Sequence, residues 1–232
     1  MAVVVSAAAP APARVAIAAP EALLAERASA VARLRHLAGC SDAQFSAAYA
    51  PLLAAFAGYV QRLPDAAGDT LLDARLARAA GVLSRRRGAV LPPGAEPEQA
   101  AREADAWTYA LFALALLRGL GTALARWAVP LWSADGRALG RWRPQTEPRG
   151  LSRVAGAAAY AALPTDEPPG ADWTALVAGA LLPADGLNWL WREPAVAAVW
   201  HRALVSAELP PEIAGLFAVP TASEGAGDAR AV

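Results

Sequence analysis

The sequence predicts a mostly α-helical fold, a bundle of helices with one small β-hairpin near residues 129–142. Alanine supplies much of the 56% hydrophobic fraction, and alanine is a strong helix former. Apolar residues recur every three or four positions between glycine and proline breakers. Only around the turn signal Ser133-Ala-Asp-Gly136 does the pattern change to two short extended pieces, which indicates a hairpin.

The apolar spacing predicts each helix in turn. Pro51 interrupts the second helix, which is therefore kinked or divided in two. The helix from Glu96 to Leu117 is amphipathic at first and then fully apolar, so it should lie at the centre of the fold. The other expected helices span 21–37, 42–63, 70–87, a short segment ending at 127, 152–163, 172–182, 187–191 and 194–206.

Composition divides the chain into three parts. Residues 1–19 are rich in alanine, proline and valine, and we expect a flexible leader there. A single helical domain is expected over 20–207. The segment 208–232 is rich in proline, alanine and glycine with scattered acids, so we expect a disordered tail.

The net charge, the cysteine content and the length of the apolar runs indicate which partners and which cellular location to expect. The formal net charge is zero, so the field of the whole molecule does not favour nucleic acid or an anionic membrane. The single cysteine, Cys40, excludes an internal disulfide and fits a reducing cytoplasm. The apolar run Ala106 to Leu117 is shorter than the roughly 20 residues that span a bilayer. We therefore predict a cytoplasmic protein with no membrane partner.

Three stretches carry a family resemblance in their order and spacing. They are Tyr59-Val-Gln-Arg-Leu-Pro64 with Leu71-Leu-Asp-Ala-Arg-Leu76, then Arg87-Gly-Ala-Val-Leu-Pro-Pro93 with the apolar helix 107–117, and Leu181-Leu-Pro-Ala-Asp-Gly-Leu-Asn-Trp-Leu190. Over about 42–207 the chain resembles the TraI-type (MobH-like) N-terminal domain of conjugative relaxases, a family also described as helicases. The resemblance implies an HD-like helical bundle with a divalent metal site.

The residues at the family's metal positions differ here. Arg118 and Gly119 occupy the His-Asp pair, Thr122 the following Lys, and Ala74 the His of the preceding helix. Alanine and glycine side chains cannot bind a metal, and a permanently charged arginine repels a second cation. We therefore expect no catalytic residue, no metal ligand and no cofactor, and the motif is degenerate.

Other residues could supply chemistry in principle. Asp65, Asp69 and Asp73 are spaced four apart and could hold Mg²⁺ weakly, but acids at a helix start are favoured by the helix dipole alone. The tyrosines Tyr49, Tyr59, Tyr109 and Tyr160 could attack DNA, yet each lies in an apolar helical pattern that favours core packing.

A candidate nucleic-acid-binding surface lies between Arg118 and Arg153, where arginines outnumber acids and tryptophans are interleaved. Arginine contacts phosphates, and tryptophan offers a face on which single-stranded bases stack. The competing interpretation is a solvated hairpin whose tryptophans pack on the core. The candidate residues are Arg126, Arg137, Arg141, Trp142 and Arg143.

The hypothesis that follows is a non-catalytic relative of the relaxase domain, a pseudo-enzyme of a conjugative or integrated mobile element. Its expected partner is single-stranded DNA or a conjugation-related protein. One alternative is a divergent metal-dependent phosphodiesterase or DNA nickase with a rearranged site. Another is a purely structural or regulatory helical protein. Metal-stimulated cleavage of phosphate esters would favour the nickase, and salt-dependent binding of single-stranded DNA would favour the non-catalytic relative.

Overall fold

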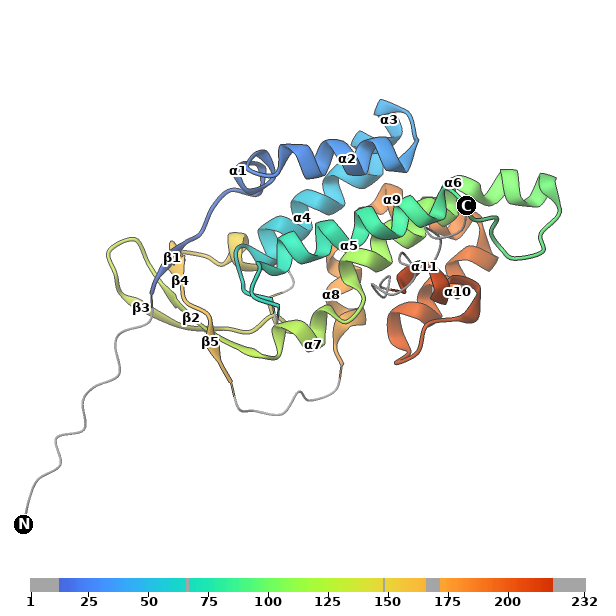
Figure 1. The fold of residues 1–232 in the computed structure, drawn as a ribbon. Helices are drawn as coiled ribbons and strands as arrows, with labels where there is room; N and C mark the ends of the chain where they lie inside the picture. The colour runs from blue at the N-terminus through green and yellow to red at the C-terminus, as the bar shows by residue number, and fades with distance from the viewer. Residues whose placement is uncertain (1–12, 66, 148, 166–171, 219–232) are drawn as a thin grey trace, which may run out of the picture.

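Helices form an elongated bundle that carries a small antiparallel sheet at one end (Figure 1). The computed structural model describes residues 13–65, 67–147, 149–165 and 172–218. The mostly helical prediction is confirmed. The helical elements are α1 (Pro20–Ala25), α2 (Ala28–Ala38), α3 (Asp42–Gln44), η1 (Phe45–Tyr49), α4 (Ala50–Val60), α5 (Leu71–Arg86), α6 (Pro97–Leu117), α7 (Leu120–Leu124), η2 (Leu151–Arg153), α8 (Thr174–Leu181), α9 (Ala184–Arg192), α10 (Pro194–Val205) and α11 (Pro211–Phe217).

The helix α6 is the centre of the bundle, as its apolar second half predicts. Every residue from Tyr109 to Leu117 is buried, and α6 packs against α5, α9 and α10. The stretch Pro97–Leu124 is long and apolar enough to cross a membrane, but 72% of its most apolar window is buried inside the fold. Its apolar character is therefore explained by its place in the core.

The predicted interruption around Pro51 is a change of helix type. Ser41 begins this helical segment, because its hydroxyl accepts a hydrogen bond from the backbone N–H of Gln44. Asp42 is the first helical residue. The wider π-helical turn η1 then precedes Pro51, which lies in the first turn of α4, where its missing N–H is tolerated.

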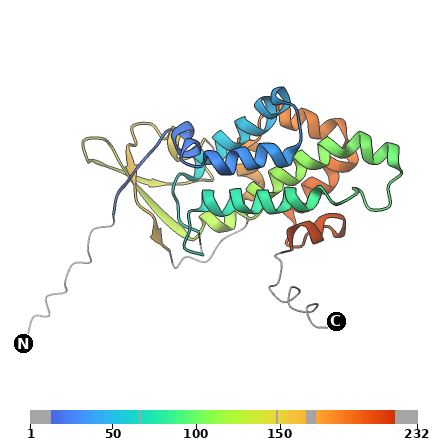
Figure 2. The same cartoon turned by 45° about the horizontal axis from the view of Figure 1, so that its top comes forward.

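The predicted hairpin is confirmed, and the sheet is larger than the sequence indicated. The strands pair in the order β1-β4-β2-β3, and β5 pairs with the start of β2. Figure 2 shows the sheet at the same end of the bundle after rotation. The strands are β1 (Val15–Ala16), β2 (Trp127–Trp132), β3 (Ala138–Trp142), β4 (Ala159–Tyr160) and β5 (Leu163–Pro164).

The helix expected over 152–163 is wrong. The structure has only the 3-10 turn η2 there, followed by β4 and β5. Tyr160 pairs with Leu131 on one side and with Val15 on the other, so β4 fills the space between two strands. Pairing to distant strands overrides the local helix preference of this alanine-rich segment.

Both ends of the domain lie further out than the sequence indicated. Val15 and Ala16 form β1, so the expected leader of 1–19 gives way to folded structure by residue 15, while residues 1–12 lie outside the described chain. The helix α11 packs against α5 with Ile213 buried, so the expected disordered tail of 208–232 does not begin at 208. Residues 219–232 also lie outside the described chain.

Gln61 holds the N-terminal segment in place. It follows α4 with a φ of 51°, a conformation uncommon for any residue other than glycine, and its side chain is fully buried. Its Oε1 accepts a hydrogen bond of 2.8 Å from the N–H of Ala18, and its Nε2 donates one of 2.9 Å to the carbonyl of Ala18. One side chain thereby satisfies both backbone groups of the residue that leads from β1 into α1.

Candidate functional site

A hollow of about 210 Å³ opens where the helical bundle meets the sheet. Its walls come from the turn after α4, from α5 and α7, and from the start of β2, beside α7 in Figure 1. It is lined by Pro64, Asp65, Arg75, Gly119, Thr122, Ala123, Arg126 and Trp127.

Arg75 brings a buried positive charge to this hollow. It lies on the apolar stripe of α5 between Leu72 and Leu76, and only 9% of it is exposed. One Nη donates a hydrogen bond of 2.6 Å to the carbonyl of Arg118. No described residue forms an ion pair with Arg75 or accepts from its remaining N–H groups. Burial lowers the pKa of this guanidinium, Asp65 opposes that effect, and Arg118 adds to it.

Two more guanidinium groups lie close to Arg75. Burial, together with the positive charges of Arg75 and Arg118, lowers the pKa of Arg78 to about 10. The side chain of Arg118 donates to the carbonyls of Ala203 at 2.9 Å and Ser206 at 3.2 Å, at the end of α10. A cation suits that position, because the last carbonyls of a helix are partly negative.

The four positions of the degenerate motif are only partly brought together. Gly119 and Thr122 line the hollow, and Gly119 adopts a φ of 72° to turn the chain from α6 into α7. Ala74 is half-buried on α5 beside Arg75 but does not line the hollow. Because the guanidinium of Arg118 is bound at the end of α10, the cations of the hollow are Arg75 and Arg126 instead.

The three aspartates considered as metal ligands do not converge. Asp65 lines the hollow, and its N–H donates to the carbonyl of Asp69 at 2.7 Å. Asp73 is bound to Arg27, with Nε to Oδ1 at 2.6 Å and Nη2 to Oδ2 at 2.9 Å. Within the described ranges no three His, Cys, Asp or Glu side chains are grouped closely enough to hold a metal ion.

The residues expected to bind nucleic acid separate into three groups. Arg126 belongs to the hollow, Arg137 lies at the hairpin turn beyond the far end of β2, and Arg141 and Arg143 are exposed at the end of β3. Trp142 is only 4% exposed and packs edge-on against Tyr59 with ring centroids 5.3 Å apart. Trp142 therefore packs on the core, in line with the competing interpretation of a hairpin whose tryptophans are buried.

The four tyrosines are core residues, which the sequence interpretation favoured over a nucleophilic role. Tyr49, Tyr59, Tyr109 and Tyr160 are all at most 1% exposed. Burial raises the pKa of each phenol, and that of Tyr160 to about 12. A raised pKa lowers the fraction of each tyrosine that is ionised, and the phenolate is the form that attacks a phosphate.

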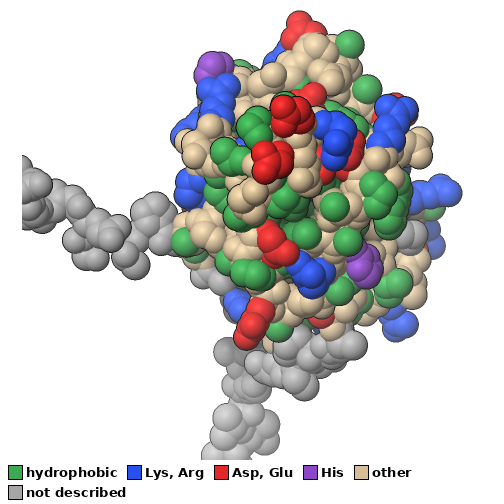
Figure 3. All heavy atoms as spheres, turned by 90° about the vertical axis from the view of Figure 1, so that its right-hand side faces the viewer, with side chains coloured by type: hydrophobic (Ala, Val, Ile, Leu, Met, Phe, Trp, Pro, Cys, Tyr) green, Lys and Arg blue, Asp and Glu red, His purple; other side chains and the backbone are tan. Residues whose placement is uncertain are grey.

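The end of the bundle far from the sheet carries charges of both signs, whereas arginines predominate around the hollow. Figure 3 shows acidic, basic and hydrophobic side chains interspersed over this face, with no surface of a single sign. The hollow, by contrast, is lined by Arg75 and Arg126 with Asp65 as its acid, and Arg78 and Arg118 interact electrostatically with Arg75.

The sequence carried a signal for Arg75 that our interpretation of the motif did not use. An arginine on the apolar stripe of an amphipathic helix has either a buried partner or a function. The family's His falls on Ala74, one position before Arg75. Arg78, one helical turn after Arg75, is a second arginine on the same side of α5.

The fold and the hollow define a helical domain with a small accessory sheet and a polar site at their junction. The chain belongs to the TraI_2 family, whose description is "Putative helicase", and the family model matches residues 15–206. The match begins at the first residue of β1 and ends just after α10, so it includes the sheet, the bundle and the hollow. No curated protein matches the sequence.

Proposed function

We propose that this protein is a non-catalytic TraI-like domain that binds single-stranded DNA through phosphate contacts in the hollow. The observation that carries the proposal is Arg75, a buried cation that faces the hollow and forms no ion pair with a described residue, with Asp65 as the acid that lines the same hollow. A buried charge is costly to keep unless an opposite charge or several hydrogen bonds compensate it. A phosphate oxygen in the hollow would supply that compensation.

The hollow suits an anion better than a cation. Arg75 and Arg126 contribute two positive charges and Asp65 one negative charge, while Arg78 and Arg118 add positive charge close by. Thr122 adds a hydroxyl that donates or accepts. Guanidinium groups bind phosphate through paired N–H donors, which favours arginine at such a site.

The same residues do not fit a divalent metal. A metal of the HD type needs imidazole and carboxylate ligands, and the hollow offers one carboxylate and one hydroxyl beside two guanidinium groups. We infer that the fold is an HD-like bundle whose metal position has become an arginine site. This inference supports the pseudo-enzyme assignment within a conjugative or mobile element.

The exposed arginines of β3 extend the proposed surface. Arg141 and Arg143 lie on and just after the strand that pairs with β2, and β2 begins at the hollow beside Arg126. A strand of DNA anchored in the hollow would pass these side chains as it follows the sheet. Backbone contacts of this kind bind without reading sequence.

The test measures binding of a labelled single-stranded oligodeoxynucleotide by fluorescence anisotropy at several salt concentrations. We expect Arg126→Gln to weaken binding and to reduce the slope of log affinity against log salt by about 0.7, the value for one lost phosphate contact on a single strand. Arg75→Met keeps the apolar stem and should weaken binding as well. Arg33→Gln removes an exposed arginine of α2 that does not line the hollow, and it should change neither quantity.

Equal salt slopes for the Arg126, Arg75 and Arg33 variants would refute the hollow as the phosphate site. Elemental mass spectrometry of protein purified without chelator tests the pseudo-enzyme assignment separately. We expect well below one metal per chain after loading with Mn²⁺ or Fe²⁺. A stoichiometric metal with metal-stimulated cleavage of phosphate esters would instead support the divergent nickase.

A further inference from the structure

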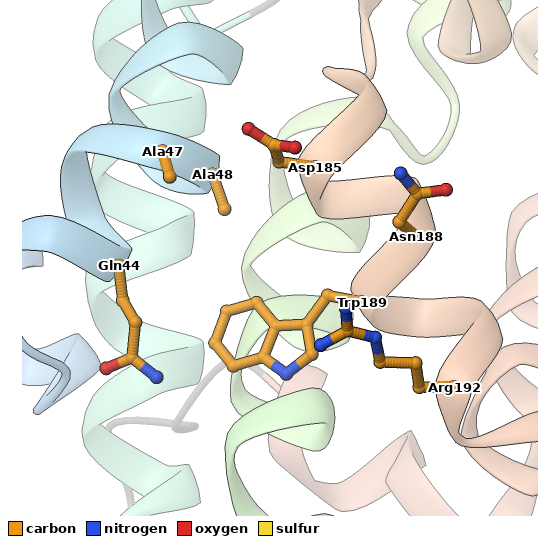
Figure 4. Close-up of a pocket in the computed structure, with 7 residues that line it drawn as sticks. All are labelled: Gln44, Ala47, Ala48, Asp185, Asn188, Trp189 and Arg192. Atoms are coloured by element: carbon orange, nitrogen blue, oxygen red, sulfur yellow. The ribbon is translucent and has the colours of Figure 1, made fainter.

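A second pocket, of about 270 Å³, lies between η1 and α9 (Figure 4). Ala47 and Ala48 of η1 form one wall, and α9 supplies the other. The indole of Trp189 extends from α9 toward η1 (Figure 4). Because the side chains on η1 are small, the pocket stays open above this ring.

One face of α9 presents an acid, an aromatic ring and a base in sequence. Asp185, Trp189 and Arg192 are spaced four and three residues apart, which places them on the same side of a helix. The Cα atoms of Asp185 and Arg192 are two turns, about 10 Å, apart along the helix axis. Figure 4 shows the side chain of Arg192 running back toward Trp189 and the carboxylate of Asp185 at the other side of the pocket mouth, so a ligand that stacks on the ring meets both charges.

Two buried tyrosines pack against the ring of Trp189 and fix its position. It stacks on Tyr109 with centroids 5.6 Å apart and 28° between the planes, and it meets Tyr49 edge-on at 6.3 Å. Gly186, one turn before it on α9, makes room for the hydroxyl of Tyr109, because a Cβ there would lie 1.9 Å from that oxygen. A flat, fixed aromatic surface loses little conformational freedom when a second ring stacks on it.

The polar groups around this ring are not used by the fold. Asp185, Asn188 and Arg192 have no ion pair or side-chain hydrogen bond with any described residue. The carbonyl oxygen of Gln44 accepts from Ser41, and this leaves the amide N–H₂ group of Gln44 free at the opposite wall. The pocket thus offers a carboxylate, two amides and a guanidinium to a ligand.

We propose that this pocket binds a single purine nucleotide. The base stacks on Trp189, its ring edge hydrogen-bonds to Asp185 and Asn188, and its phosphate pairs with Arg192. The combination of groups favours this class of ligand, because a flat ring for stacking, a carboxylate and an amide for base-edge hydrogen bonds, and a guanidinium for a phosphate line one pocket. The volume is close to the roughly 300 Å³ at the small end of ligand pockets, which suits one nucleotide and not a longer piece.

Isothermal titration calorimetry of the full chain with GMP, AMP and guanosine tests the proposal. Trp189→Leu should weaken GMP binding at least about 10-fold, as expected when stacking of a base is lost. Trp191→Leu is the matched control, because Trp191 is 60% exposed on the same helix and does not line the pocket. Arg192→Gln should weaken GMP binding and leave guanosine binding unchanged, and this exposed substitution does not disturb the fold.

A short purine oligodeoxynucleotide distinguishes the two sources of the ligand. Binding of GMP or AMP that depends on Trp189 and Arg192 identifies a free nucleotide. Oligonucleotide binding that depends on these residues, without mononucleotide binding, identifies one nucleotide of a strand. The proposal is overturned if no probe binds, or if the variants at 189 and 191 behave alike. Oligonucleotide binding that depends on Arg126 is binding in the hollow between the bundle and the sheet. The proposal for this pocket and the proposal for the hollow can therefore be refuted separately.

Discussion

At the scale of single residues, the pair Arg27–Asp73 joins the start of α2 to the start of α5. Two parallel hydrogen bonds connect the guanidinium and the carboxylate, and Arg27 also donates to the carbonyl of Leu23 at 2.9 Å. The hydrogen bond from Arg27 holds the pKa of Asp73 below its ordinary value, and the hydroxyl of Thr70 contributes in the same direction. Asp73 therefore stabilises the fold only while it is ionised.

We expect Asp73→Asn to lower the free energy of unfolding by about 1 kcal/mol at pH 7, a value that allows for solvent screening of this partly exposed pair. Because the folded pKa of Asp73 is depressed, its contribution is complete above the ordinary aspartate pKa of about 3.9 and is lost as the pH falls through the folded value. Urea unfolding from pH 7 down to pH 3 should show the difference from the parent protein shrinking. Asp69→Asn, in the preceding turn, is the control, because it removes a carboxylate that is not bonded to Arg27.

A second prediction at this scale concerns Gly150. Its φ of 77° favours glycine, and a Cβ there would lie 2.3 Å from the backbone Cα of Tyr59. Gly150→Ala forces either η2 or the end of α4 to move, so we expect destabilisation of about 2–4 kcal/mol. Gly156→Ala also has a positive φ but has open space around it, and it should cost less. Similar midpoints of thermal unfolding for the two variants would contradict the steric argument.

At the scale of elements, the sheet depends on contacts that a local sequence pattern does not encode. The hairpin of β2 and β3 could be predicted, because a turn signal lies between two extended pieces. β1 and β4 could not, because each is two residues long and pairs with a strand distant in sequence. The prediction of a helix over 152–163 was wrong for the same reason, because the spacing of alanines does not indicate that a segment pairs with two strands distant in sequence.

Gln61 is the element-scale test of how the N-terminal segment is held. Gln61→Leu keeps most of the volume but removes the partners of the N–H and carbonyl of Ala18. We expect a loss of about 2–4 kcal/mol, because two backbone groups lose their hydrogen bonds. Amide hydrogen exchange at Ala18 and Ile17 should accelerate more than exchange in α6. Uniform acceleration throughout the chain would show that Gln61 supports the whole fold and not this segment in particular.

At the scale of the whole molecule, α6 supplies the core around which the other helices are arranged. Leu114 on α6 is 1% exposed, whereas Leu176 on α8 is 68% exposed. We expect Leu114→Ala to lower the free energy of unfolding by about 2–5 kcal/mol and Leu176→Ala to change it by less than about 0.5 kcal/mol. Equal effects in chemical denaturation would show that α6 does not occupy the centre of the core.

The candidate sites were predictable to different degrees. Thr122, Gly119 and Arg126 could be connected with a site from the sequence, through the family motif or the density of arginines. Their meeting with Arg75 and Asp65 depends on how α5 and α7 pack against the start of β2, which no local pattern specifies. The stripe on α9 could not be placed from the sequence, because the helix was expected only over 187–191 whereas α9 begins at Ala184 and so includes Asp185. Its pocket also depends on η1, which brings two alanines opposite Trp189.

The pairing of Val15 with Tyr160 sets an order for events during synthesis on the ribosome. The adjacent helices α5 and α6 can pack against each other soon after they emerge, because their contacts are close in sequence. β1 emerges among the first residues but must wait for β4, which at roughly 5–20 residues per second takes several seconds or more. During that interval β1 is an unpaired strand, available to chaperones that bind exposed strands.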